Sequence, residues 1–440
     1  MASLNEKQLK SLSTLWAAIS PELRVQLKSA AGSSGKLAEV FAIIDGESEA
    51  DTEVPDYDTV LFRIFADVTG TQDQPPTHSR FSSEQLKKIK ELTAPDSHDQ
   101  PAESDDAAMQ TWRSKIAESL SVQLQRSQSE KDVLRRLKGE LGNDFEALLG
   151  DAQTLLENDQ ILHAALQPFP EAIADLSPDL VDEARDAHET ICNDAPDASL
   201  WFLKILTARL KKTPQIFRVV EKIGRKSDDS LVSKTDLADI GDLVLANAAF
   251  YADRLTKAPQ TLEEAEAAGT AVAEFVRISV GMTREFGIRK DGDWGKTLFG
   301  IRAKASAALE EFFRQFEQSF PRALPQPAKG QRGLAKAGTI PEPAIIEQAE
   351  AALCLLAATA DWATQAAVAS PQKHAADLAR NELDKCGRNL LEILRTAEDD
   401  DKTFAVEALA LVVRYMRAFE DDENADLIQR RSAAVQANAA

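Results

Sequence analysis

The 440-residue chain has few of the residues that mark secreted or membrane-spanning proteins. Its three cysteines, Cys192, Cys354 and Cys386, are too few and too far apart for a disulfide framework or a CxxC pair. No apolar signal-peptide run opens the sequence, and apolar stretches such as residues 353–360 are shorter than the roughly 20 residues that cross a bilayer. We therefore expect a cytoplasmic protein without a transmembrane segment.

Basic residues are in the minority, with 51 Lys and Arg against 72 Asp and Glu and a net charge of −21. Phosphate contacts need clustered cations, so the composition argues against nucleic acid as a partner of the whole chain. The hydrophobic fraction of 43% is too high for a wholly disordered chain. The composition predicts a folded protein with an acidic surface.

Signals of β-structure are scarce, because alternating β-branched runs bounded by Asn-Gly or Asp-Gly turns are almost absent. Helix start signals recur instead. A hydroxyl residue precedes proline at Ser20-Pro21, Ser177-Pro178, Thr213-Pro214 and Ser370-Pro371. Proline tolerates the first helical position, where its missing N–H would be unpaired, and the hydroxyl can cap the next free amides.

A capping-box spacing, Thr261 followed by Glu264, adds a fifth helix start, and an apolar helical stripe continues from Leu262 to Val280. These patterns predict an all-α protein made of multi-helix bundles, with essentially no β-sheet.

Two stretches read as linkers. Residues 93–106 hold two prolines and five acidic residues without a Lys or Arg, and residues 321–343 hold five prolines and three glycines. They divide the chain into a small helical region (1–92), a central helical domain (107–320), a C-terminal helical bundle (344–431) and a frayed tail (432–440).

An internal similarity occurs at a spacing of 45 residues. The matching residues are Arg209, Leu210, Lys212, Pro214, Gln215, Glu221 and Gly224 with Arg254, Leu255, Lys257, Pro259, Gln260, Glu266 and Gly269. The period is typical of paired-helix repeats and would give the central part a short HEAT-like stack of helical hairpins. The alternative is a coincidence between two helix–turn–helix corners, which share proline and glycine positions in any case.

Residues 199–226, the cationic segment, reverse the charge of the rest of the chain, because one acidic residue, Glu221, faces eight basic ones. The basic residues are Lys204, Arg209, Lys211, Lys212, Arg218, Lys222, Arg225 and Lys226. They could form a surface for an anionic partner. Alternatively, they form a solvated edge that the protein's own carboxylates neutralise. Apolar residues cover most of the first helix of the segment, which favours a buried bundle helix over one that lies on lipid.

No reaction centre is recognisable. The run Gly295-Lys296-Thr297 resembles the end of a phosphate-binding loop, but Lys290 stands where the first glycine is required. The pair His188-Glu189 is followed by Cys192 instead of the second histidine of a zinc site. We predict no catalytic, cofactor or metal residues, and we expect His78 and His98 to be solvated.

By elimination, the sequence predicts a non-enzymatic helical scaffold or adaptor that binds other proteins. One alternative is a small-ligand sensor or enzyme whose site is assembled from residues distant in sequence, for instance around His163, His188, Arg277, Arg284 and Trp294. A second alternative is peripheral association with anionic membranes through residues 199–226.

Overall fold

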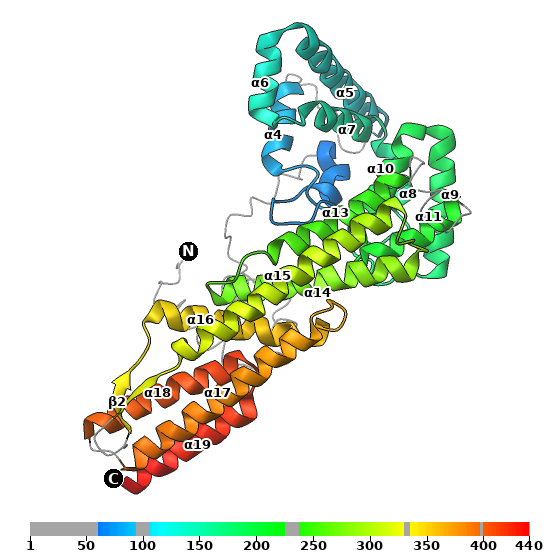
Figure 1. Ribbon diagram of the computed structural model, residues 1–440. Helices are drawn as coiled ribbons and strands as arrows, with labels where there is room; N and C mark the ends of the chain where they lie inside the picture. The colour runs from blue at the N-terminus through cyan, green and yellow to red at the C-terminus, as the bar shows by residue number, and fades with distance from the viewer. Residues whose placement is uncertain (1–59, 94–105, 225–236, 330–334, 397–398, 440) are drawn as a thin grey trace, which may run out of the picture.

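The computed structural model describes residues 60–93, 106–224, 237–329, 335–396 and 399–439. These residues form a multi-helix fold, which confirms the predicted all-α class (Figure 1). Ser20-Pro21, His98, Arg225 and Lys226 lie outside the described residues, as does most of the first predicted linker.

Five helices from the first described part of the chain form one end of the molecule (Figure 1). They are η1 (Val60–Val68), α4 (Ser83–Thr93), α5 (Asp106–Ser129), α6 (Lys131–Leu141) and α7 (Phe145–Glu157). In α6 the apolar residues Val133, Leu137 and Leu141 recur every four positions and all three are buried. That spacing places them on one face of a helix, so burial against α5 and α7 stabilises it.

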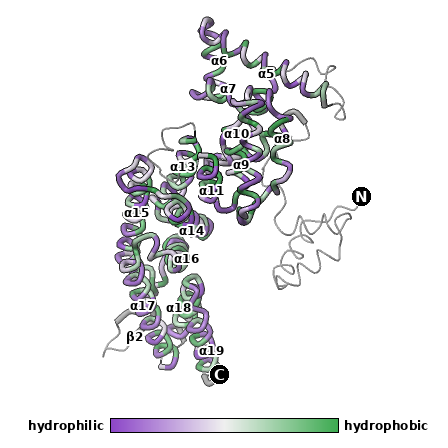
Figure 2. The backbone as a smooth tube through the Cα atoms, turned by 90° about the vertical axis from the view of Figure 1, so that its right-hand side faces the viewer, coloured by the Kyte–Doolittle hydropathy of each residue, from purple (hydrophilic) through white to green (hydrophobic). Residues whose placement is uncertain are grey.

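The chain continues through α8 (Asp159–Leu166), α9 (Pro178–Asp194), η2 (Pro196–Ala198), α10 (Ser199–Arg209), η3 (Thr213–Gln215) and α11 (Ile216–Gly224). Three helices follow: α13 (Ala238–Arg254), α14 (Leu262–Glu285) and α15 (Asp293–Ala323). The rest comprises α16 (Pro343–Ala358), η5 (Ala360–Trp362), α17 (Ala369–Thr396), α18 (Asp399–Ala418) and α19 (Asp422–Ala439). Hydrophilic and hydrophobic positions alternate along these helices, as expected of amphipathic packing (Figure 2).

Two hydrophobic cores meet within α13, α14 and α15. The first contains Phe202 and Phe217, and the second contains Phe275 and Tyr415. Helix α15 contributes to both, with Trp294 and Leu298 in the first core and Phe313 and Phe320 in the second. The boundary between the cores therefore lies inside the predicted central domain and not at residues 321–343.

The predicted linker 321–343 is structured over most of its described part. Helix α15 runs through Pro321 to Ala323, which is possible because a proline in the last turn removes a single backbone hydrogen bond. Strands β1 (Gln326–Lys329) and β2 (Ala335–Thr339) then pair antiparallel. This hairpin is the only sheet among the described residues.

The C-terminal region also differs in detail from its predicted form. Residues 432–439, the predicted frayed tail, continue α19 as a helix. Helix α19 is separated from α18 by Glu420, which has a left-handed φ of 59°. Ala425 and Ile428 anchor the start of α19 on the second core, and Val435 within the predicted tail also packs against this core, which explains why the helix continues there.

Two of the predicted helix starts are capped as expected. Ser177 Oγ accepts from Leu180 N–H at 3.3 Å. Thr261 Oγ1 accepts from Glu264 N–H at 3.2 Å, and the Glu264 carboxylate accepts from Gln260 N–H at 2.7 Å. The other two described positions do not act as caps: α17 begins one residue before Ser370, and η3 begins at Thr213 itself.

The two halves of the 45-residue similarity occupy matching corners. Arg209 ends α10 and Arg254 ends α13, and the two arginines pair with Asp67 and Asp73. The helices around them pack differently, because α13 and α14 pack along each other whereas α11 packs mainly against α9. The HEAT-like stack stays a prediction.

Residues Pro343–Trp362 are long and apolar enough to cross a membrane by length and composition alone. Core helices of soluble proteins meet the same criterion, and Leu353, Leu355 and Leu356 of α16 are buried in the second core. This helix is weak evidence for a membrane span, and the predicted absence of one stays a prediction.

An ion pair is buried between α5 and α8. The Asp159 side chain is 0% exposed and the Arg113 side chain 5%, with 2.7 Å between Arg113 Nη1 and Asp159 Oδ2. Arg63 Nη2 lies 3.6 Å from the same oxygen. Burial raises the pKa of Asp159, and the charges of the two arginines oppose that rise.

Candidate functional site

The cations of residues 199–226 are mostly paired with carboxylates of the same chain. Of the six described cations, five make ion pairs: Lys204 with Asp239 (3.6 Å), Arg209 with Asp67 (2.9 Å), Lys212 with Asp175 (3.1 Å), Arg218 with Glu285 (2.7 Å) and Lys222 with Asp182 (2.9 Å). Lys211 has no ion-pair partner among the described residues. These pairs support the interpretation of an edge neutralised by the protein's own acidic groups.

This segment also holds the connection between α8 and α9. Arg209 donates to the carbonyl oxygens of Leu166 (3.2 Å) and Phe169 (3.0 Å). Ile173 N–H donates to Arg209 O at 2.7 Å, and Lys211 N–H donates to Ile173 O at 3.0 Å. The connection is thereby fixed to the corner of residues 210–215, which joins α10 to α11.

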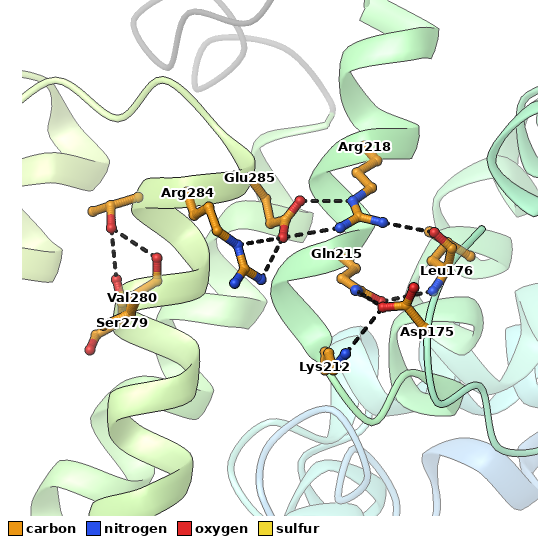
Figure 3. A network of polar contacts seen from close by, with 10 residues as sticks. Asp175, Leu176, Lys212, Gln215, Arg218, Ser279, Val280, Arg284 and Glu285 are labelled. Carbon is orange, nitrogen blue, oxygen red and sulfur yellow. Dashed lines mark hydrogen bonds and ion pairs between the residues drawn. The ribbon is translucent and has the colours of Figure 1, made fainter. Parts of the chain in front are cut away.

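Side chains at the end of this corner and in α11 continue the network (Figure 3). Gln215 is buried; its Oε1 accepts from Leu176 N–H at 2.9 Å, and its Nε2 donates to Asp175 at 2.5 Å. Arg218 donates to Leu176 O at 2.8 Å and to Glu285 Oε2 at 2.7 Å. The network therefore joins the α8–α9 connection, α11 and the end of α14.

Glu285 is the acidic centre of this network. Its side chain is 8% exposed and accepts from Arg218 and also from Arg284, whose Nη2 lies 2.7 Å from Oε1 (Figure 3). The hydrogen bond from Arg218 is the main cause that lowers the pKa of Glu285 below its usual value of 4.5.

Replacing Glu285 by glutamine is expected to make the free energy of unfolding depend less on pH between pH 7 and pH 3. A lowered folded-state pKa stabilises the fold above the unfolded-state pKa, near 4.5, and this contribution disappears as the pH falls through the folded-state value. At pH 7 the variant should therefore be less stable than the wild type by on the order of 1 kcal/mol. Urea unfolding at pH 7 and at pH 3 would measure a difference that shrinks in acid.

The control is Glu310→Gln, at an exposed position of α15. It should leave the urea midpoint near that of the wild type at both pH values. A Glu285→Gln difference that stayed constant from pH 7 to pH 3 would show that the charge of Glu285 does not contribute.

A cavity of about 730 Å³, called here the α14 cavity, lies between the corner 210–215 and α14. Residues of the loop before α4, of α13 and of η5 complete its walls, among them Thr77, Asn247, Tyr251 and Trp362. Thr77 and Asn247 fix the loop to α13, because Asn247 accepts from Thr77 N–H at 3.2 Å and donates to Thr77 Oγ1 at 3.0 Å.

Cationic groups outnumber carboxylates in the α14 cavity. Its charged lining residues are Lys211, Lys212, Arg277 and Arg284 with Glu274 and Glu285. Arg277 pairs with Glu274, and its guanidinium lies 5.3 Å from the centre of the Trp362 ring. The cavity lining therefore has an excess of positive charge, whereas the whole chain has a net charge of −21.

Two polar groups of the corner have no partner among the residues that the structure describes. Besides the Lys211 ammonium, the buried Oγ1 of Thr213 has no hydrogen-bond partner in the described part of the chain. Both residues line the α14 cavity. Buried hydroxyls are normally hydrogen-bonded, and the Thr213 oxygen is an exception. Because that oxygen has almost no accessible surface, the exposed Lys211 ammonium is the group of the two that a ligand can reach.

A close contact fixes the corner on α14. A Cβ atom added to Gly281 would lie 2.8 Å from Pro214 Cγ, so the absence of a side chain lets the proline ring rest on the helix. This contact therefore fixes the position of the cavity wall with Lys211 and Thr213 relative to the wall with Arg277 and Arg284.

The prediction of a solvated His78 is wrong. His78 is half-buried and lines the α14 cavity, because Thr77 beside it is held on Asn247. Burial is the main cause that lowers the pKa of His78 below its usual value of 6.5, so its ring is neutral at pH 7.

The structure brings together part of the alternative site predicted from the sequence. Of the five residues named for it, Arg277 and Arg284 line the α14 cavity. His163, His188 and Trp294 do not: Trp294 packs in the first core, and His188 is buried beside Cys192, with 3.6 Å from Nδ1 to Sγ. Nothing in the sequence marked Tyr251, Thr213 or the loop at Thr77 as part of a binding site, because only the tertiary fold places them at the cavity.

No group of three or more His, Cys, Asp or Glu residues that could hold a metal ion occurs in the ranges that the structure describes. The run 295–297 lies in the first turn of α15, after a loop and not after a strand. Comparisons of the chain with protein-family models, with curated proteins and with solved structures found no match.

Proposed function

We propose that this protein binds an anionic small molecule in the α14 cavity. The observation that carries the proposal is the exposed Lys211 ammonium, which has no ion-pair partner among the described residues, beside two partly exposed arginines. The Arg277 side chain is 51% exposed and the Arg284 side chain 65%, so a ligand can reach both. Arginine and lysine form strong charge-assisted hydrogen bonds with carboxylate and phosphate oxygens.

The size and surroundings of the cavity support a small ligand. A volume of about 730 Å³ lies within the range of roughly 300–1,000 Å³ typical of ligand pockets. Because the whole chain has a net charge of −21, a local excess of cations attracts an anion that the rest of the protein tends to repel. This proposal makes the protein a helical ligand-binding protein, such as a sensor.

Loss of the Lys211 charge is expected to weaken anion binding. In isothermal titration of the full chain with citrate and with pyrophosphate, Lys211→Gln should raise the dissociation constant about fivefold to tenfold, because it removes one charge-assisted hydrogen bond of roughly 1–1.4 kcal/mol. Lys211 makes no ion pair within the described chain, so the melting temperature should not change.

The matched control is Arg314→Gln on α15, which removes an exposed cation outside the cavity. It should bind both anions as the wild type does. The proposal is overturned if no anion binds the wild type, or if Lys211→Gln and Arg314→Gln bind alike.

The scaffold and membrane interpretations stay predictions. Large apolar side chains with high exposure in the described ranges lie on four different helices: Val122, Leu262, Ile345 and Val406. They give no single docking groove to argue from. The cations proposed for a membrane contact are mostly paired internally, which reduces the charge that residues 199–226 can offer to lipid headgroups.

A further inference from the structure

Two arginines reach the α14 cavity from the same face of one helix. Arg277 and Arg284 are seven residues apart on α14, and seven residues are close to two full turns. At a rise of 1.5 Å per residue, their Cα atoms are about 10 Å apart along the helix axis. The cavity therefore has two cationic positions at a spacing set by helix geometry.

Each arginine has N–H donors available for an anion in addition to the carboxylate that it already binds. In the hydrogen bonds between described residues, Arg277 uses Nη1 for Glu274, and Arg284 uses Nε and Nη2 for Glu285. A guanidinium has five N–H donors, so each arginine has N–H groups left over. Glu285 also accepts hydrogen bonds from Arg218, so its single negative charge neutralises the charge of Arg284 only in part.

The wall between the two arginines is apolar. Ile278, Val280 and Gly281 line the cavity between them, and Pro214 rests on Gly281 from the facing corner. An uncharged hydrocarbon segment suits this stretch, because a polar one would lose its water without gaining a hydrogen bond.

Resting on the proposed function, we infer that the ligand of the α14 cavity is a linear dianion: two carboxylates joined by an apolar spacer, one carboxylate on Arg277 and the other on Arg284. Lys211 of the facing corner adds a third cation to the lining of the cavity. The probe is an eight-carbon α,ω-dicarboxylate, because seven C–C bonds of about 1.5 Å in a zigzag span roughly 9 Å, close to the spacing of about 10 Å between the two Cα atoms.

The experiment is isothermal titration of the full chain with suberate, which has eight carbons and two carboxylates, succinate, which has four carbons, and octanoate, which has eight carbons and a single carboxylate. Suberate should bind at least tenfold more tightly than succinate and than octanoate. Arg277→Gln and Arg284→Gln should each weaken suberate at least tenfold, to the affinity of octanoate. Arg314→Gln, outside the cavity, should leave all three affinities unchanged.

The outcomes separate the two proposals. If citrate or pyrophosphate binds but suberate shows no advantage over succinate or octanoate, the dianion inference is overturned and the proposed function stands. Equal suberate binding by the wild type and both arginine variants also overturns the inference. If no anion binds, both proposals fail. Circular dichroism of the arginine variants checks that a loss of binding is not a loss of fold.

Discussion

Asp159→Asn is expected to lower the free energy of unfolding by about 3–5 kcal/mol, the largest effect of any single change proposed here. The carboxylate is fully buried, and it is the counter-charge for Arg113, whose side chain is also almost fully buried. Asparagine keeps the shape of the side chain but leaves a guanidinium charge without its partner in a place that water does not reach. A buried charge without its counterion costs far more than an exposed one.

Urea unfolding followed by circular dichroism would measure the loss, and hydrogen exchange should locate the increased opening in α5 and α8. The double variant Arg113→Met with Asp159→Leu should recover most of the stability, because it removes both charges and retains apolar volume. Asp182→Asn, at an exposed ion pair with Lys222, should change little. A loss in the double variant as large as in Asp159→Asn would show that the ion pair is not the cause.

Gly241→Ala is expected to destabilise the packing of α13 on α15 by about 2–3 kcal/mol. A Cβ atom at position 241 would overlap the Trp294 ring. The ring cannot easily move away: its Nε1 donates to Asp242 at 2.9 Å, and it packs against Phe217 and Phe286 at centroid distances of 5.7 and 5.9 Å. The added methyl group must therefore separate the helices or displace the ring.

Gly300→Ala is the matched control, because a Cβ atom at this exposed position of α15 meets nothing within 4 Å. Alanine has the higher helix propensity, so this variant should gain up to about 1 kcal/mol. Thermal and urea unfolding of the two variants should move in opposite directions. A Gly241→Ala variant as stable as the wild type would mean that α13 and α15 are not held as closely as the structure places them.

Local features of the fold were predictable from the sequence because short-range interactions decide them. Ser177 and Thr261 cap helices through amides three residues away, and the apolar stripe of α14 depends only on the helical period. The β1–β2 hairpin was missed because its strands contain little of the usual signal: they hold one β-branched residue, Thr339, and a proline, Pro327.

The partners of the cationic residues could not be predicted, because they are distant in sequence. Arg209 pairs with Asp67, which is 142 positions away, and Arg218 pairs with Glu285, which is 67 positions away. A charge count finds the cationic segment but not the carboxylates that the fold brings to it. The sequence therefore left open whether the segment is free or neutralised, and the tertiary contacts favour the second interpretation.

The candidate site was predictable only in part for the same reason. Arg277 and Arg284 can be placed on one helical face from their spacing, but the facing wall comes from residues 210–215 and the loop near Thr77. The close approach that forms the wall depends on Gly281 opposite Pro214. A glycine inside a helix does not by itself predict a close contact, because the sequence does not show which residue packs against it.

Because α15 is a single helix of 31 residues that packs in both cores, it is a rod about 46 Å long. Its first turn carries Trp294, and its last turns carry Phe316 and Phe320 of the second core. A tilt of about 5° at the Trp294 end would displace the Phe320 end by roughly 3 Å, given the rise per residue. Small adjustments around α13 and α14 are therefore amplified at the far end of the molecule, where α17, α18 and α19 lie (Figure 1).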